Sequence, residues 1–211
     1  MTIQSINTKE STNHQISDVS ENIVLNFSRP LKFTRGDNYL FTSEYVKNEG
    51  IYIWTIKDEL NNNNYVHYIG ETLSLGQRQK EHIIHMTGLN YQILDAESAK
   101  KGIVEIWWNG MWRDKSPYAV SNMLENYKEL SKKAVDYISL INVYFAPTSY
   151  EGHVRKHIEG CLGWNFRKNY PELKKFYPDD NHVGRKKQLL GRKLFVNLPE
   201  AIAGIDREQM I

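Results

Sequence analysis

Two short stretches of the chain, residues 51–56 (IYIWTI) and residues 65–69 (YVHYI), are rich in β-branched and aromatic residues. Residues of these types favour β-strands. Four consecutive asparagines, residues 61–64, separate the two stretches, and asparagine tolerates the left-handed backbone of tight turns. The pattern predicts a β-hairpin whose second strand ends at Gly70.

Helical spacing of apolar residues predicts three helices after the hairpin. We expect them over residues 74–86, with Ser74 as the N-cap, over residues 121–134 and over residues 149–166. Further apolar runs predict strands over residues 103–108, 137–145 and 194–198, and residues 22–27 (NIVLNF) form a short apolar element. Strands and helices that alternate in this way are typical of a mixed α/β protein.

Composition narrows the class of protein. The chain has 211 residues, of which 40% are hydrophobic, enough to build a core. Cys161 is the single cysteine, so no internal disulfide can form, and no apolar run approaches the length of about 18 residues that a membrane helix needs. The polar residues 1–20 lack the pattern of a signal or transit peptide. We therefore expect a protein of the cytoplasm with no membrane partner. Association with the nucleoid is compatible with this location.

The charge is unevenly distributed. The net charge is only +2, but residues 151–193 contain eleven Lys and Arg against five acids. A basic stretch of this kind suits contact with phosphate groups, and a solvated helix face gives the same count. Charge alone leaves both interpretations open.

Two tripeptides occupy matching places in the hairpin. Gly50-Ile51-Tyr52 opens the first strand, and Tyr68-Ile69-Gly70 closes the second. The next predicted helix carries Arg78 and His82, and the helix over residues 149–166 carries Glu159. In this order the residues resemble the GIY-YIG nuclease family over about half of the chain, and an ordered set is far more specific than either tripeptide alone.

The resemblance implies a fold and a division of the chain. The fold is an α/β, GIY-YIG nuclease-like core with a mainly antiparallel three-stranded sheet flanked by helices. We expect this core at residues 49–170, with an insertion at residues 89–117. Residues 1–48 would form an N-terminal arm or extension, and residues 171–211 a basic C-terminal extension.

The resemblance also implies a site, with Tyr52, Tyr68, Arg78, His82 and Glu159 as catalytic residues and Glu159 as the ligand of Mg²⁺ or Mn²⁺. Side chains at period-two positions on adjacent strands project from one sheet face, so both tyrosines can approach one phosphate. A guanidinium holds a phosphate through two parallel hydrogen bonds. A lone carboxylate can bind a hard cation that keeps several waters. The set therefore fits hydrolysis of a phosphodiester.

Other residues are candidates for supporting roles. His85 lies on the same face of the helix as Arg78 and His82. Family members carry an asparagine beyond the glutamate, for which Asn169 and Asn181 are favoured here over Asn165, and a lysine after the YIG tripeptide, where this chain has Glu71. Contacts with DNA backbone phosphates are expected from basic residues in and beyond the core: Lys80, Arg167, Lys186, Lys187 and Arg192.

Each feature also has a structural interpretation. The two tyrosines could simply pack across the hairpin, and Glu159 could pair with Arg155 one helical turn earlier. His153 and His157 have the spacing of half a zinc site, but no third ligand is evident. The tryptophans of residues 107–112 (WWNGMW) could stack on unpaired bases or fill a core or an interface.

The sequence as a whole favours a divalent-metal-dependent endonuclease that hydrolyses DNA phosphodiester bonds. A role in restriction, in repair or in a mobile element stays open. The first alternative is a catalytically inactive nucleic-acid-binding module on the same fold, although such a module has no need of all five catalytic side chains. The second is a nuclease directed at RNA.

Overall fold

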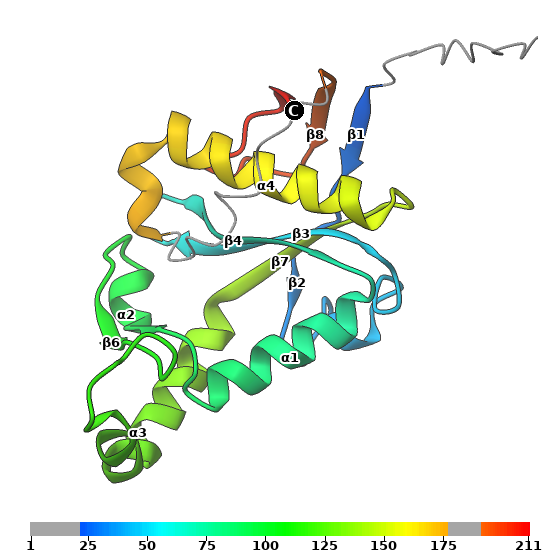
Figure 1. The fold of residues 1–211 in the computed structure, drawn as a ribbon. Coiled ribbons are helices and arrows are strands. Elements are labelled where there is room, and N and C mark those ends of the chain that lie inside the picture. The colour runs from blue at the N-terminus through cyan, green and yellow to red at the C-terminus, as the bar shows by residue number, and fades with distance from the viewer. Residues whose placement is uncertain (1–21, 177–190) are drawn as a thin grey trace, which may run out of the picture.

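A computed structural model of the chain describes residues 22–176 and 191–211. It shows a mixed α/β protein, as predicted, whose largest sheet is antiparallel throughout (Figure 1). The strands follow the spatial order β2 (Leu31–Lys32), β7 (Ile141–Pro147), β3 (Gly50–Asp58) and β4 (Asn63–Thr72). The prediction of three strands is wrong by one, because β2 pairs with β7 and is too short to produce a hydrophobic pattern.

Strands β3 and β4 form the predicted hairpin. Tyr52 lies opposite Gly70, and Trp54 lies opposite Tyr68. The register then shifts by one residue, which leaves His67 as the extra residue of a β-bulge on β4. Because of the bulge, Val66 and Ile69 pack in the same hydrophobic cluster although an odd number of positions separates them.

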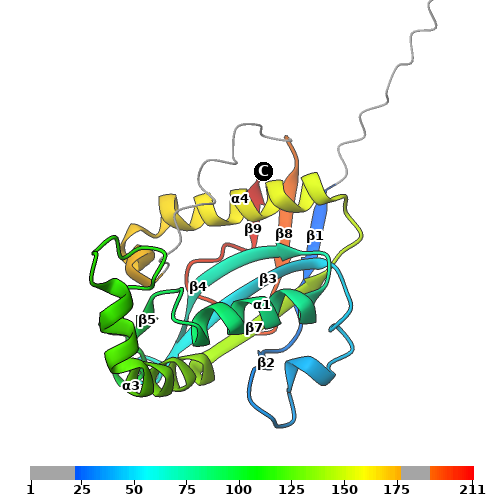
Figure 2. The same cartoon turned by 60° about the horizontal axis from the view of Figure 1, so that its bottom comes forward.

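Helices cover both faces of the large sheet. α4 (Gly152–Asn169) lies on one face, and α1 (Leu75–Thr87) and α3 (Ala119–Leu140) lie on the other (Figures 1 and 2). Side chains of β3 alternate between the two layers: Ile51 and Ile53 pack toward α4, whereas Tyr52 and Trp54 pack toward α1. β3 is therefore buried on both faces, and β4, which carries the second tripeptide, lies beside it at the edge of the sheet.

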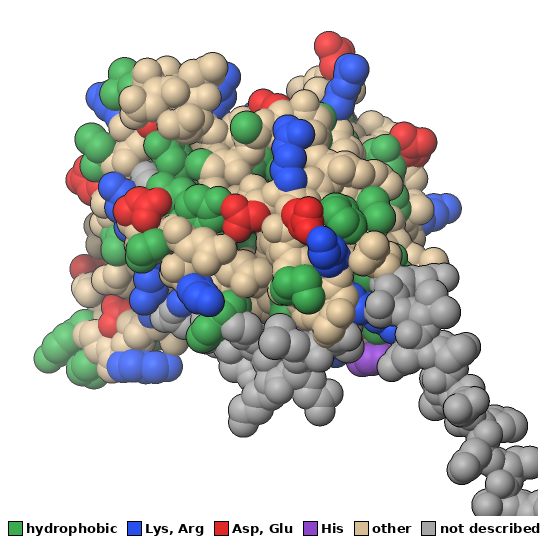
Figure 3. All heavy atoms as spheres, turned by 90° about the horizontal axis from the view of Figure 1, so that it is seen from above, with side chains coloured by type: hydrophobic (Ala, Val, Ile, Leu, Met, Phe, Trp, Pro, Cys, Tyr) green, Lys and Arg blue, Asp and Glu red, His purple; other side chains and the backbone are tan. Residues whose placement is uncertain are grey.

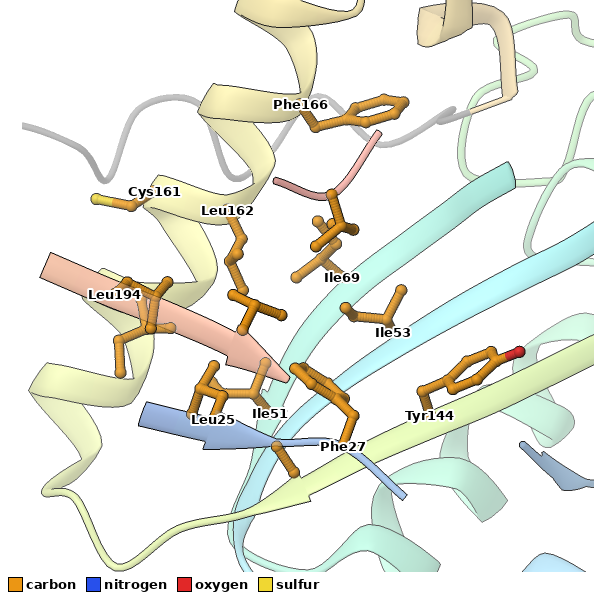
Figure 4. Packing of buried hydrophobic residues seen from close by; sticks show 14 of the residues in the cluster. Leu25, Phe27, Ile51, Ile53, Ile69, Tyr144, Cys161, Leu162, Phe166 and Leu194 are labelled. Carbon is orange, nitrogen blue, oxygen red and sulfur yellow. The ribbon is translucent and has the colours of Figure 1, made fainter. Parts of the chain in front are cut away.

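A second sheet joins the two predicted extensions. β1 (Ile23–Asn26) pairs in parallel with β8 (Lys193–Asn197), which pairs with β9 (Glu208–Met210). Figure 4 shows Leu25 of β1 and Leu194 of β8 packed with Leu162 of α4 and Ile51 of β3. Segments from outside the expected core thus complete the hydrophobic layer on its α4 side.

The remaining elements are short. The expected insertion contains β5 (Ile93–Leu94), α2 (Ala96–Ala99) and β6 (Ile106–Trp108), and β5 pairs with β6. Two 3-10 helices lie at Leu40–Thr42 and Pro171–Phe176. No helix within the described residues combines the length and the apolar character needed to cross a bilayer.

Several predicted boundaries are wrong: β6 begins at Ile106 rather than at residue 103, α4 covers Gly152–Asn169 rather than residues 149–166, and the largest difference lies at the end of α3. Residues 137–140, expected to begin a strand, are the last turn of α3, and β7 begins at Ile141. Tyr137 and Ile138 continue the buried stripe of Leu130 and Ala134 at helical spacing. An unbroken apolar run fits either period, so the pattern alone could not place the change from helix to strand.

Glycine at position 50 is required by a close approach of backbone. A Cβ at Gly50 would lie 2.2 Å from the carbonyl oxygen of Ala146 on β7, and the backbone of a central strand pair cannot move aside. We expect Gly50→Ala to lower the free energy of unfolding by about 1–3 kcal/mol, the usual cost of overpacking. Thermal unfolding followed by circular dichroism measures the loss. Gly152→Ala is the control, because its Cβ would meet only Arg155 at 3.6 Å; an equal loss in both variants would contradict this explanation.

Candidate active site

A cleft of about 370 Å³ opens at the edge of the large sheet, beside β4. Its wall combines the end of β4, the turn that follows, the first half of α1 and the first half of α4. Helices from opposite faces of the sheet therefore meet over this edge. The lining residues are Tyr68, Glu71, Thr72, Leu73, Ser74, Gln77, Arg78, Glu81, Lys156 and Glu159.

Three of the five predicted catalytic residues line this cleft: Tyr68, Arg78 and Glu159. The other two, Tyr52 and His82, are buried behind it, with 0% and 1% of their surface exposed. The rings of Tyr52 and Tyr68 stack with their centroids 5.9 Å apart, and His82 meets both rings edge to face. Side chains from β3, β4 and α1 thus form one compact group next to the cleft.

The position of His82 differs from the expected one. The spacing predicts His82 on the substrate-facing side of its helix, but it belongs to the buried residues of α1 together with Gln79 and Met86. Its Nε2 lies 2.7 Å from the Tyr52 hydroxyl, and its Nδ1 lies 3.2 Å from the hydroxyl of Tyr91. Both ring nitrogens therefore lie within hydrogen-bonding distance of a phenol, and His82 is buried behind the cleft rather than exposed in it.

Electrostatics keeps Tyr52 protonated. Burial raises the pKa of Tyr52 well above its ordinary value, the neighbouring Tyr68 raises it further, and the charge of Arg78 opposes both effects. Burial by itself lowers the pKa of Arg78, but its interactions with Tyr52, Glu81 and Tyr68 outweigh that effect and raise it. Arg78 is therefore always a cation, and it favours loss of a proton from Tyr52.

A second charged group fixes the opposite wall. Arg155, almost fully buried on α4, forms ion pairs with Glu49 at 2.6 Å and with Glu71 at 3.4 Å, and it donates to the carbonyl of Tyr150. Glu159, 3% exposed, accepts a hydrogen bond from the backbone N–H of Glu71 at 3.3 Å. These contacts hold the end of β4 against α4 and orient both carboxylates of the cleft.

Two charged residues of this wall escape the sequence-based prediction. In the sequence, Glu71 is only a departure from the family pattern and Lys156 only one member of the basic stretch, yet both line the cleft. The partner of Glu71, Arg155, lies 84 positions later in the chain. The place of Glu71 directly after the YIG tripeptide is a signal for its role, but nothing local identifies its partner.

The cleft suits a hard divalent cation through its carboxylates. Glu159 and Glu71 supply oxygen ligands on one side of the cleft, and Glu159 has a second carboxylate oxygen besides the one that accepts from Glu71. Mg²⁺ is typically held by one or two carboxylates with several waters retained. Within the part of the chain that is described, no group of three or more His, Cys, Asp or Glu could hold a metal ion. The donor set therefore fits a largely hydrated ion rather than an ion caged by protein.

The other predicted residues lie away from the cleft or outside the described residues. His85 contacts the rings of Tyr91 and Trp112 instead. Asn169 donates to Asp206, and Asn165 donates to Gln209. The predicted phosphate contacts Lys80, Arg167 and Arg192 do not line the cleft. Residues 177–190 are not described, so the predictions for Asn181, Lys186 and Lys187 lie outside the described residues.

The histidine pair on α4 has other contacts. His153 lies 3.1 Å from a carboxylate oxygen of Glu151, and His157 lies 3.4 Å from the sulfur of Cys161. Burial lowers the pKa of His157. In the described residues these two histidines thus belong to no metal-binding cluster.

The tryptophans of the insertion are more exposed than core residues. Trp107 is 39% exposed beneath the ammonium group of Lys133, and Trp112 is 54% exposed beside His85 and Tyr91. Trp108 packs against the core and donates to the carbonyl of Leu89. Trp112 therefore extends the aromatic group of Tyr52, His82 and Tyr91 to the surface.

The face on the side of α4 carries both signs of charge. Figure 3 views the molecule from above the orientation of Figure 1, and its Lys and Arg side chains are interspersed with Asp and Glu. A surface of this kind attracts a polyanion only weakly and at particular points. On this face we therefore expect phosphate contacts at particular points rather than over a broad basic surface.

Tyr91 is expected to control His82, because its hydroxyl is a partner of Nδ1 and the partner of one ring nitrogen sets the tautomer of the other. Tyr91→Phe should lower the rate of DNA cleavage by about fivefold, corresponding to one hydrogen bond of about 1 kcal/mol, and should shift the pH profile. Tyr118→Phe, an exposed tyrosine at the start of α3, is the control. An unchanged rate and pH profile in Tyr91→Phe would exclude this role.

Comparisons with protein-family models, with curated proteins and with solved structures return no match to this chain.

Proposed function

We propose that this protein is a divalent-metal-dependent endonuclease of the GIY-YIG type, which hydrolyses phosphodiester bonds of DNA in the cleft between α1, β4 and α4. The observation that carries the proposal is the convergence of Tyr68, Arg78 and Glu159 on one cleft. These residues come from three elements, and Glu159 lies 81 positions after Arg78. A hydrogen-bonded tyrosine and histidine directly behind the cleft add to its support.

The residues in and behind the cleft have different roles in the proposed hydrolysis. Arg78 binds a non-bridging oxygen of the scissile phosphate and offsets the negative charge that grows there in the transition state. Tyr68 borders the cleft and holds the attacking water. Tyr52 has no exposed surface, so the water proton can reach it only through a group of the cleft wall. We assign Tyr52 the uptake of that proton together with His82, whose Nε2 is within hydrogen-bonding distance.

The raised pKa of Tyr52 sets a condition on this step. A phenol that is protonated at neutral pH can accept a proton only as it gives up its own. His82 Nε2 is the acceptor within reach, at 2.7 Å, and the positive charge of Arg78 favours the transfer. Tyr52 and His82 thus act as one base.

Glu159, with Glu71 beside it, would hold a Mg²⁺ or Mn²⁺ ion. When bound, the ion supplies a Lewis acid that stabilises the leaving alkoxide. Glu81, paired with Arg78 at 3.1 Å, and Lys156 on the facing wall tune the charge of the cleft around it. Because only these two carboxylates would hold metal, we expect the reaction to use a single metal ion.

A cleavage assay tests the proposal. Purified protein is incubated with supercoiled plasmid, branched DNA and single-stranded DNA in Mg²⁺, in Mn²⁺ or in EDTA. We expect nicked or linear products with either metal and none in EDTA. Parallel RNA substrates of matched sequence report the choice of nucleic acid.

Two outcomes would contradict the proposal. DNA binding without cleavage of any substrate would identify a binding module on this fold. If the protein cleaved RNA alone, the assignment of the active site to this cleft would stand, but the substrate would be RNA instead of DNA. The second outcome is chemically distinct, since a ribose 2′-hydroxyl can then act as the nucleophile and the products would carry different ends.

A further inference from the structure

A second cleft, of about 360 Å³, shares no residue with the first. It is lined by residues of β2, β3, β4 and β7, by the end of α3 and by the turn after α2. β4 is the one strand that reaches both clefts, with Asn64 at the second cleft and Tyr68 and Glu71 at the first. The two clefts therefore lie at different positions along β4.

Three lysines from different elements converge on this second cleft: Lys32 of β2, Lys57 of β3 and Lys100 at the end of α2. Lys100 is paired with Glu97 at 2.8 Å. Among the described residues, Lys32 and Lys57 form no ion pair and no side-chain hydrogen bond through their ammonium groups. Two unpaired cations in one concave site make a place where an anion is stabilised.

The acids of the cleft form no ion pair with Lys32 or Lys57 among the described residues. Both carboxylate oxygens of Glu200 are engaged, one by the Tyr144 hydroxyl at 2.6 Å and the other by the side-chain amide of Asn64 at 3.0 Å. Glu59 contributes to the field at Lys100. Lys32 and Lys57 therefore remain the two lysines of the cleft whose ammonium groups have no described carboxylate at ion-pair distance.

The two unpaired lysines also repel each other. Burial lowers the pKa of Lys32, and the charge of Lys57 lowers it further. A bound anion between them would relieve that repulsion and favour the charged form of Lys32. A lysine in a cleft whose pKa is lowered by burial and by a neighbouring cation is typical of a site that binds an anion.

We propose that the second cleft binds a phosphate group through Lys32, Lys57 and Lys100. Lysine is a good ligand for phosphate as a compact, strongly hydrated point charge. The phosphate comes either from the backbone of a nucleic acid or from inorganic phosphate in solution. The site does not depend on the proposed nuclease activity, because it uses none of the residues of the first cleft.

Inorganic phosphate tests the site directly. The wild-type protein is titrated with phosphate against chloride at matched ionic strength, while NMR follows the lysine side chains and circular dichroism follows the melting temperature. We expect the pKa of Lys32 to rise and the melting temperature to increase with phosphate concentration. The double variant Lys32→Gln/Lys57→Gln should abolish the thermal response, whereas Lys128→Gln/Lys132→Gln, on the exposed face of α3, should keep it.

A DNA arm identifies the source of the phosphate. Binding of a duplex is measured in EDTA, without cleavage, over a range of salt concentrations. If the ligand is the DNA backbone, the slope of log K against log salt should fall by about 2 in Lys32→Gln/Lys57→Gln, since each lysine that neutralises a DNA phosphate contributes about 0.9 to it. An unchanged slope, together with a thermal response to phosphate that disappears, assigns the site to inorganic phosphate. An unmoved Lys32 pKa, and equal thermal responses in wild type and Lys32→Gln/Lys57→Gln, would overturn the proposal whether or not the protein cleaves DNA.

Discussion

Arg78→Ala is expected to lower the rate of DNA cleavage by about 10²–10³-fold, the usual effect of removing one pre-organised donor to a transition-state oxyanion. Arg78 is a cation of the first cleft, and it interacts with both Tyr52 and Tyr68. The substitution would remove the phosphate contact and the charge that favours proton loss from Tyr52. Single-turnover cleavage with enzyme in excess measures this step separately from substrate binding.

Lys80→Ala is the matched control for Arg78→Ala. Lys80 is an exposed cation on the same helix, and it does not line the cleft. Its removal should change binding slightly and single-turnover cleavage very little. Circular dichroism should show both variants folded. A wild-type cleavage rate in Arg78→Ala would exclude the first cleft as the active site.

Glu159→Gln is expected to lower cleavage by at least about 100-fold, because it removes the carboxylate that would hold the metal while keeping the size of the side chain. The glutamine oxygen can still accept from the N–H of Glu71, so the wall of the cleft should stay in place. Mn²⁺ binding measured by electron paramagnetic resonance should weaken in parallel. The two readings together separate loss of the metal from loss of fold.

Glu151→Gln is the control for Glu159→Gln. Glu151 precedes the same helix, is exposed and pairs with His153. It should leave Mn²⁺ binding and cleavage unchanged. If Glu159→Gln bound Mn²⁺ as tightly as wild type, the assignment of the metal to Glu159 would be wrong, even if cleavage were abolished.

The local features of the fold are predictable from the sequence, and the distant pairings are not. The hairpin follows from its β-branched residues and asparagine turn, and α1 begins and ends within one residue of the prediction. The extent of α3 escapes prediction because residues 137–140 suit either a helix or a strand. β2 escapes it because it has two residues, and the pairing of β1 with β8 depends on contacts that no local pattern contains.

For the candidate site, the sequence identifies side chains better than their surroundings. Tyr52 and Tyr68 are expected on one sheet face, and their rings stack there. The spacing of α1 cannot distinguish a buried histidine from an exposed one, because His82 lies at the border of the apolar stripe. Its burial depends on Tyr52, which lies on β3, and on Tyr91, which follows the end of α1.

The parallel pairing of β1 with β8 has a consequence for the order of folding. Asn26 and Asn197, joined through their side chains, are 171 positions apart. During synthesis, β1 and the apolar side of α4 therefore stay exposed until β8, which pairs with β1, has been synthesised. We expect nascent chains that stop before Lys193 to depend on chaperones, although α1 and α4 are already complete.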